Sequence, residues 1–311
     1  MADPFNLRIP VFAAPMFLVS GPELVIAACR AGIVGAFPTP NCRTAQELDA
    51  WMTEIAAGVS ARASSRVAPW AANLITHSTN ARLRDDLALV AKHKPPIVIT
   101  ALGSPKPALD AVHGYGGKVF ADVININLAQ KAVAAGADGL VCIAAGAGGH
   151  TGYFSPFAFI SAVREFFKGP LVIGGGISDG AGVAGAIAAG ADYAYMGTRF
   201  LPTAESRAVA AYKQMIVDCG PDDLIVSAAL TGTPASWLRP SLAACGIDLE
   251  ALAGKPARDY TPDTAHKRWR DTWAAGQGLH AVKEIGTVAA VVDTLERDYR
   301  AAIAAFEART R

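Results

Sequence analysis

The sequence predicts an α/β fold, a closed (β/α)8 TIM barrel with a smaller helical insertion after its eighth strand. Short apolar runs alternate eight times with longer Ala-rich segments that carry charges at helical spacing. Most of the runs are continuously apolar, as expected for parallel strands buried on both faces. The triplet Gly-Ala-Asp joins a helix to a strand twice, at 136–138 and 190–192. Eight such units favour a closed barrel, and an open doubly wound sheet is the alternative that counting leaves open.

The expected elements follow one another along the first 200 residues. The strands are 9–16, 33–38, 70–75, 97–103, 118–123, 139–144, 171–176 and 193–198. The helices between them include 22–31, 44–59, 80–93, 127–135, 156–167 and 179–189. Several helices begin with a Ser, Thr, Asp or Asn cap or an early Pro, and several end at Gly.

The pattern breaks after the eighth strand. Residues 203–278 are richer in charge and Pro and contain three of the five tryptophans. We interpret this stretch as a helical insertion, or lid domain, over the barrel mouth. Residues 1–202 and 279–311 would then form the barrel domain, with 287–311 as a long amphipathic helix that completes it.

Composition excludes several classes of protein. The 311 residues carry 28 Lys+Arg against 27 Asp+Glu, and 52% of them are hydrophobic. Such a chain is too apolar for disorder, and it has no basic cluster for nucleic acid. Without an uninterrupted apolar run of ~20 residues or a signal peptide, we expect a soluble, cytoplasmic protein that does not enter the membrane. An apolar, Ala-rich chain is compatible with a homodimer.

Neither a disulfide framework nor a metal site is expected. The five cysteines are scattered and form no CxxC pair. The six histidines show no HxH or HExxH spacing. The common zinc sites contain one or the other of these patterns.

Two glycine-rich loops suggest a phosphate site. Gly175 and Gly176 follow the seventh strand, and Gly197 and Thr198 follow the eighth. Glycine lets backbone N–H groups approach a phosphate, and the helix that begins after Gly176 adds a favourable dipole. The loops after strands 7 and 8 are where barrel enzymes commonly hold phosphate.

A single histidine stands in a third glycine-rich loop. His150 follows Gly148 and Gly149 directly after the sixth strand. The carboxyl ends of barrel strands face the active site, and imidazole can transfer a proton near neutral pH. His150 is therefore the predicted catalytic residue.

Three further positions could contact a cofactor. Ala14, Pro15 and Met16 end the first strand, where backbone groups could contact a planar ring. Asn73 offers an amide that both donates and accepts hydrogen bonds. Lys118 opens the fifth strand, and a cation there could stabilise an anionic cofactor.

Taken together, these residues resemble the nitronate monooxygenase, or 2-nitropropane dioxygenase-like, family of FMN-dependent barrel enzymes. The matching elements occur in family order, and the Ala-Gly-Gly-His-Thr-Gly segment at 147–152 is the most specific of them. The resemblance implies FMN with its phosphate on Gly175, Gly176, Gly197 and Thr198. It places the ring near Ala14, Pro15, Met16, Asn73 and Lys118, with Gly148 and Gly149 adjoining the cofactor and His150 beside the substrate.

The chain departs from the family at two positions. Members often carry a Gln and a Glu before this segment, and here Ile143 and Gly146 stand there. A flavin contact and a polar group of the substrate pocket are thereby replaced.

Three functions remain open. The first is oxidation of an alkyl nitronate by O2 to a carbonyl compound and nitrite, with His150 as base or hydrogen-bond partner. The second is an NAD(P)H-dependent reductase of a quinone or enoyl thioester on the same FMN scaffold. The third is a flavin-free barrel that binds a phosphate ligand.

Overall fold

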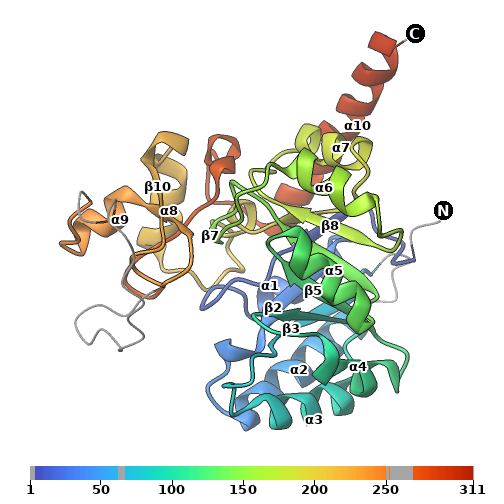
Figure 1. Cartoon of the computed structure of the whole chain (residues 1–311). Coiled ribbons are helices and arrows are strands. Elements are labelled where there is room, and N and C mark those ends of the chain that lie inside the picture. Colours follow the sequence, from blue (N-terminus) through green and yellow to red (C-terminus); the bar gives the residue numbers. More distant parts are fainter. Residues whose placement is uncertain (1–3, 62–66, 250–251, 253–268, 311) are drawn as a thin grey trace.

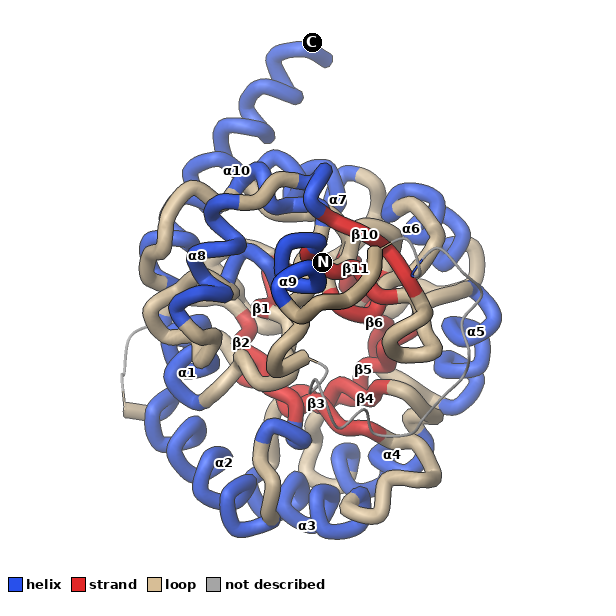
Figure 2. Tube along the Cα trace, turned by 90° about the vertical axis from the view of Figure 1, so that its left-hand side faces the viewer, coloured by secondary structure: helices blue, strands red, loops and turns tan. Residues whose placement is uncertain are grey.

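The computed structural model describes residues 4–61, 67–249, 252 and 269–310. Eight parallel strands close into a barrel (Figure 2) in the order β1-β2-β3-β4-β5-β6-β8-β9. The strands are β1 (Val11–Ala13), β2 (Val34–Pro38), β3 (Trp70–Ile75), β4 (Ile97–Ala101), β5 (Lys118–Val123), β6 (Gly139–Ile143), β8 (Leu171–Gly174) and β9 (Tyr193–Met196). Because β1 pairs with β9 as well as with β2, the barrel closes. The predicted barrel is confirmed, and the open sheet is excluded.

The barrel interior is filled by large apolar side chains. Phe12, Phe120 and Tyr193 pack against one another there, with ring centroids 5.1 to 6.1 Å apart where they are in contact. Phe5, ahead of β1, packs on the same three rings. Residues one position away in each strand, such as Ala121 on β5, pack instead against the surrounding helices. This alternation follows from the two-residue period of a strand.

The helices surround the strands in the predicted order. They are α1 (Pro22–Arg30), α2 (Ala45–Ser60), α3 (Leu83–His93), α4 (Lys106–His113), α5 (Ile126–Ala135), α6 (Pro156–Arg164), α7 (Gly180–Ala188) and α10 (Val288–Thr310). Side chains of Thr44, Asn125, Ser155 and Asp179 cap four of them by accepting a backbone N–H bond. The sequence did not predict α4, an eight-residue helix whose segment contains a proline in its first turn.

The segment after β9 contains strands as well as helices. It includes α8 (Ala210–Asp218), β10 (Leu224–Ser227), β11 (Ala235–Leu238) and α9 (Arg239–Ala244). The prediction of a helical insertion holds for α8 and α9 but not for 224–227 and 235–238. There the residues form two antiparallel strands, β10 and β11. A third short strand, β7 (Gly149–His150), pairs with β11 and extends the sheet.

This small sheet and its helices lie at one end of the barrel. Figure 1 shows them beside the barrel, and Figure 2, viewed from that side, shows α9 and β11 in front of the ring of strands. After them α10 returns to the barrel, where its first half packs against α7 and its last turns project into solvent (Figure 1). The division of the chain into domains at 202/203 and 278/279 stays a prediction.

Candidate active site

The loops after β1 and β9 meet at the carboxyl end of the barrel. The Ala14 N–H donates to the Met196 carbonyl across 2.9 Å. A Cβ added at Gly197 would lie 3.5 Å from the Met16 Sδ and 3.8 Å from the Ala14 Cβ. Three residues predicted to hold a cofactor, Ala14, Met16 and Gly197, are therefore neighbours, and Pro15 lies between the first two.

The β1 loop is fixed by an asparagine from the next unit. The Asn41 Nδ2 donates to the carbonyls of Met16 and Ser20, at 3.1 and 2.8 Å. Its Oδ1 accepts from the Leu18 N–H at 2.8 Å, and this bond holds Leu18 at a φ of +62°. The loop that would face the cofactor ring is thus held by side-chain bonds and does not depend on the cofactor for its shape.

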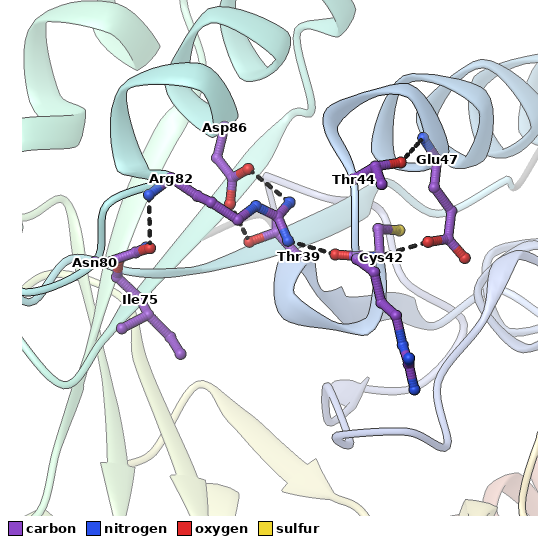
Figure 3. Close-up of polar contacts among 9 residues, drawn as sticks. Thr39, Cys42, Thr44, Glu47, Ile75, Asn80, Arg82 and Asp86 are labelled. Carbon is purple, nitrogen blue, oxygen red and sulfur yellow. Dashed lines mark hydrogen bonds and ion pairs between the residues drawn. The ribbon is translucent and has the colours of Figure 1, made fainter.

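A buried polar cluster holds the loops after β2 and β3 in turn (Figure 3). Asp86 of α3 accepts from the Thr39 hydroxyl and the Arg82 guanidinium, both at 2.9 Å. The same guanidinium also donates to the Cys42 carbonyl. Because Asp86 is only 2% exposed, these bonds are needed to satisfy its charge. They fix the segment from which Asn41 reaches the β1 loop.

Asn73 faces the interior of the barrel near its carboxyl end. On β3 it has the same parity as Ala71, which belongs to the interior cluster. It is 7% exposed, and its Nδ2 donates to the Ile99 carbonyl at 3.1 Å. The amide is therefore oriented toward the region enclosed by the cofactor loops.

His150 belongs to the small sheet. As part of β7 it pairs with Ala235 of β11, and the adjacent Thr151 N–H donates to the Pro234 carbonyl at 3.0 Å. Its ring lies edge-on to the Trp269 ring, with 5.3 Å between centroids. The Trp269 ring also packs against the Trp237 ring, with 4.5 Å between their centroids. The ring of His150 reaches solvent, but desolvation by the surrounding protein lowers its pKa, which favours the neutral imidazole at pH 7.

Three loops converge at Gly146, and they leave no room for a side chain at position 146 or 148. Its carbonyl accepts from the N–H groups of Gly176 and Gln277, at 3.1 and 2.9 Å. A Cβ at Gly146 would lie 2.8 Å from the Gln277 Oε1, and the residue has a φ of +87°. Gln277 therefore occupies the space into which a side chain at 146 would point. Gly148 is equally restricted, since its Cβ would lie 2.6 Å from the Gly276 nitrogen.

The predicted phosphate loops lie against the segment that precedes α10. Gly175 and Gly176 have φ angles of +139° and +68°, which favour glycine. The Thr198 Oγ1 accepts from the Gly276 N–H at 2.9 Å. The Ser178 side chain packs against Gly278, where a Cβ would lie 2.7 Å from its Oγ. That Oγ is buried without a hydrogen-bond partner.

Partnerless polar atoms gather at this end of the barrel. Among the residues that the structure describes, eight buried side-chain nitrogen or oxygen atoms lack a hydrogen-bond partner. They belong to Thr76, Asp122, Ser178, Tyr195, Arg199, Ser236, Trp237 and Thr272. All eight lie in the carboxyl halves of barrel strands, in the loops that follow them, or in the segment that carries the small sheet. Buried polar groups are normally paired, so their distribution fits a polar ligand such as a flavin.

Lys118 does not join this group. It is the first residue of β5, at the amino end of the barrel, with its Nζ 3.0 Å from the Asp138 carboxylate. It lines a hollow of about 910 Å³ at that end. The predicted contact with the cofactor ring is therefore not supported, because the first residue of a parallel strand lies opposite the other site residues.

Several residues at the site were missed by sequence reasoning. Ser178, Trp269 and Gln277 lie far from the glycine motifs in sequence or follow them in loops with no distinctive pattern. Asp122 could have been noticed, because it is a single acid in the apolar run of β5.

Comparison with known proteins decides the family. A family model described as nitronate monooxygenase matches residues 1–298. The chain belongs to the nitronate monooxygenase family. It is therefore an oxidoreductase, and enzymes of this family depend on flavin.

The chain is also similar to individual proteins. A nitronate monooxygenase of Paraburkholderia phytofirmans is 29% identical over 277 residues, which cover 77% of this chain and 76% of that protein. An octahydroindene-carboxyl-CoA dehydrogenase of Mycobacterium tuberculosis is 28% identical, over 78% of this chain and 66% of the relative. FabK from Thermotoga maritima superposes with a TM-score of 0.82 at 24% identity, over 98% of this chain and 97% of that chain, a likeness of fold. Within the described residues, no helix is both long and apolar enough to span a bilayer.

Proposed function

We propose that the protein oxidises alkyl nitronates with O2, producing a carbonyl compound and nitrite, and that its flavin is FMN. The observation that carries this proposal is the position of His150, which β7 holds at the carboxyl end of the barrel beside the glycine loops. Membership of the nitronate monooxygenase family supplies the reaction class.

The two sides of the site would have different tasks. The loops after β8 and β9 would hold the FMN phosphate, with Gly175, Gly176, Gly197, Thr198 and the Ser178 hydroxyl around it. Ala14, Pro15, Met16 and Asn73 would adjoin the ring, with Gly148 and Gly149 on the loop above it. FMN bound there supplies the electron acceptor that O2 regenerates.

His150 would act on the substrate. A nitronate carries its negative charge on the nitro oxygens, and an imidazole N–H can donate a hydrogen bond to them. The lowered pKa of His150 keeps the ring neutral at pH 7, so its other nitrogen can accept a proton from the parent nitroalkane. Trp269 limits how the imidazole can turn.

The test is an anaerobic visible spectrum of the flavin-loaded protein, before and after an alkyl nitronate is added. Bleaching of the oxidised flavin bands, followed by their return and by nitrite release when O2 is admitted, is the expected result. A flavin spectrum indifferent to nitronate would overturn nitronate oxidation. A colourless protein that cannot be reconstituted with FMN would overturn the cofactor.

A second candidate is an NAD(P)H-dependent reductase of an enoyl thioester or quinone. It is favoured by the relative from Mycobacterium tuberculosis, whose name gives a CoA thioester as its substrate. Anaerobic bleaching by NADPH or NADH but not by nitronate, with reoxidation by an enoyl-CoA or a quinone, would establish this function instead.

A further inference from the structure

An acid lies inside the barrel just below the cofactor loops. In β5, Ala121 and Val123 pack against the outer helices, whereas Phe120 belongs to the interior cluster. Because side chains alternate along a strand, Asp122 faces the interior. It is the second-last residue of β5 and therefore lies in the carboxyl half of the barrel.

A tyrosine on the other side of the interior faces the same space. Tyr195 packs with the interior cluster and immediately precedes Met196, whose carbonyl accepts from Ala14. Its register partner on β8 is Gly174, which has no side chain to occupy the intervening room. The two glycines of the predicted phosphate loop follow Gly174 directly.

Each of these two side chains has a buried polar atom without a partner. The Asp122 Oδ1 and the Tyr195 hydroxyl are both buried and lack a hydrogen-bond partner. Burial, and after it the charge of Asp122, raises the pKa of Tyr195 well above its usual value, so the two groups interact electrostatically. Buried polar atoms without a partner are costly, and a ligand above them would remove that cost.

Within the part of the chain that the structure describes, no cation balances Asp122. Burial alone raises its pKa, to about 7. The Tyr195 hydroxyl shares the barrel interior with it, as do the Asn73 amide on β3 and Ile143 on β6, whereas the Cys142 thiol of β6 packs on the outer side. The only cation predicted for this site, Lys118, lies at the opposite end of the barrel.

We propose that Asp122 is a proton-exchanging residue on the barrel side of the flavin, and that it takes up a proton from solvent when reduction adds negative charge above it. Asp122 would be ionised beforehand and neutral afterwards, so one proton enters per negative charge added. Tyr195 positions this exchange by donating its hydroxyl to the ionised carboxylate when the flavin covers both groups. The inference rests on the proposed flavin site but not on the substrate.

The test counts protons in the flavin-loaded protein. Photoreduction in weakly buffered solution at pH 8, with an indicator dye, gives the number of protons taken up per flavin. Asp122→Asn is expected to take up as much as one proton fewer than the wild type at pH 8 and the same number at pH 5.5, where Asp122 is already protonated. Asp138→Asn, at the amino end of the barrel, is the matched control and is expected to equal the wild type at both values.

Each outcome decides a different question. Equal uptake by the wild type and Asp122→Asn, with full flavin occupancy in both, would overturn the role of Asp122 and leave the flavin site intact. Failure of the wild type to bind flavin would overturn the proposed function instead. If Asp122→Asn does not fold, infrared difference spectra of the wild type decide: a carboxylic-acid carbonyl band that grows on reduction at pH 8 and is altered in Tyr195→Phe supports the proposal, and its absence overturns it.

Discussion

The imidazole of His150 meets the indole of Trp269 edge to face, with an interplanar angle of 73°. The contact joins a two-residue strand at the barrel mouth to a residue more than a hundred positions later in the chain. Trp269 has a φ of +68°, which a bulky side chain adopts only when its surroundings impose it. The packing between these two rings therefore sets the orientation of the predicted catalytic group.

Replacement of His150 should separate catalysis from cofactor binding. His150→Ala is expected to retain flavin, because the predicted phosphate loops lie on β8 and β9, and to lose turnover by roughly 10²- to 10⁴-fold, as is usual for a missing acid–base group. Flavin absorbance and nitrite release measure the two effects. His113→Ala, in which an exposed imidazole at the amino end is removed, is the control. Unchanged turnover in His150→Ala would contradict the assignment.

The pH profile should reveal the state of His150. Desolvation lowers its pKa below the ordinary 6.5, and the proposed role uses the neutral ring. The rate of oxidation of a parent nitroalkane is therefore expected to rise as pH increases through that lowered pKa and to be level by pH 7. If the rate of His150→Asn still rises over the same pH range, another group is responsible for the rise.

The phosphate loop should not tolerate a branched side chain. Gly176 has a φ of +68°, and a Cβ there meets nothing closer than 3.9 Å, so backbone strain rather than a clash opposes Gly176→Val. Strain of about 1–2 kcal/mol would shift the loop, and we expect lower FMN occupancy after purification. Gly185→Ala, on α7 with open space around it, should keep full occupancy. A fully loaded Gly176→Val would count against the phosphate site.

Lys118 should be dispensable for the cofactor. Its side chain is 55% exposed and pairs with Asp138 at the far end of the barrel. Lys118→Ala is expected to leave the flavin spectrum and the affinity for FMN unchanged and to alter the free energy of unfolding by no more than about 1 kcal/mol. A tenfold weaker affinity for FMN in a titration would restore this lysine to the site.

Asp122 should make the flavin-free protein less stable at high pH. Its folded pKa of about 7 lies above the unfolded value, so the native state holds the proton more tightly. Stability is then full below the unfolded pKa and is lost as pH rises toward 7. Asp122→Asn should remove this loss, raising the unfolding free energy at pH 8 by up to about 4 kcal/mol relative to the change at pH 4. Urea denaturation at the two pH values would show it, and equal shifts at both would contradict it.

The barrel could be predicted because its periodicity is local. Each apolar strand and each capped helix can be recognised within a window of about a dozen residues. Parallel strands buried on both faces have few alternative pairing partners. The small sheet could not be predicted, because β10 and β11 are four residues each and pair with a strand of two residues from a glycine loop. Such pairing becomes visible only after the barrel brings residues 149–150 next to 235–236.

The site was predictable where a motif and a strand end coincide. His150 and the glycines of the β8 and β9 loops satisfy that condition, and the structure brings them together at one end of the barrel. Lys118 does not meet this condition, because the first residue of a parallel strand lies at the amino end of the barrel. Gln277 and Trp269 carried no sequence signal, because their position depends on how the chain returns after α9.

Because β7 pairs with β11, the proposed site is formed by two structural units, the barrel and the small sheet. The loops proposed to hold the cofactor phosphate follow strands of the parallel barrel, whereas His150, with Gly149 beside it, is paired into the antiparallel sheet. Substitutions in residues 224–238 would therefore change how His150 is held while leaving the proposed phosphate loops unchanged.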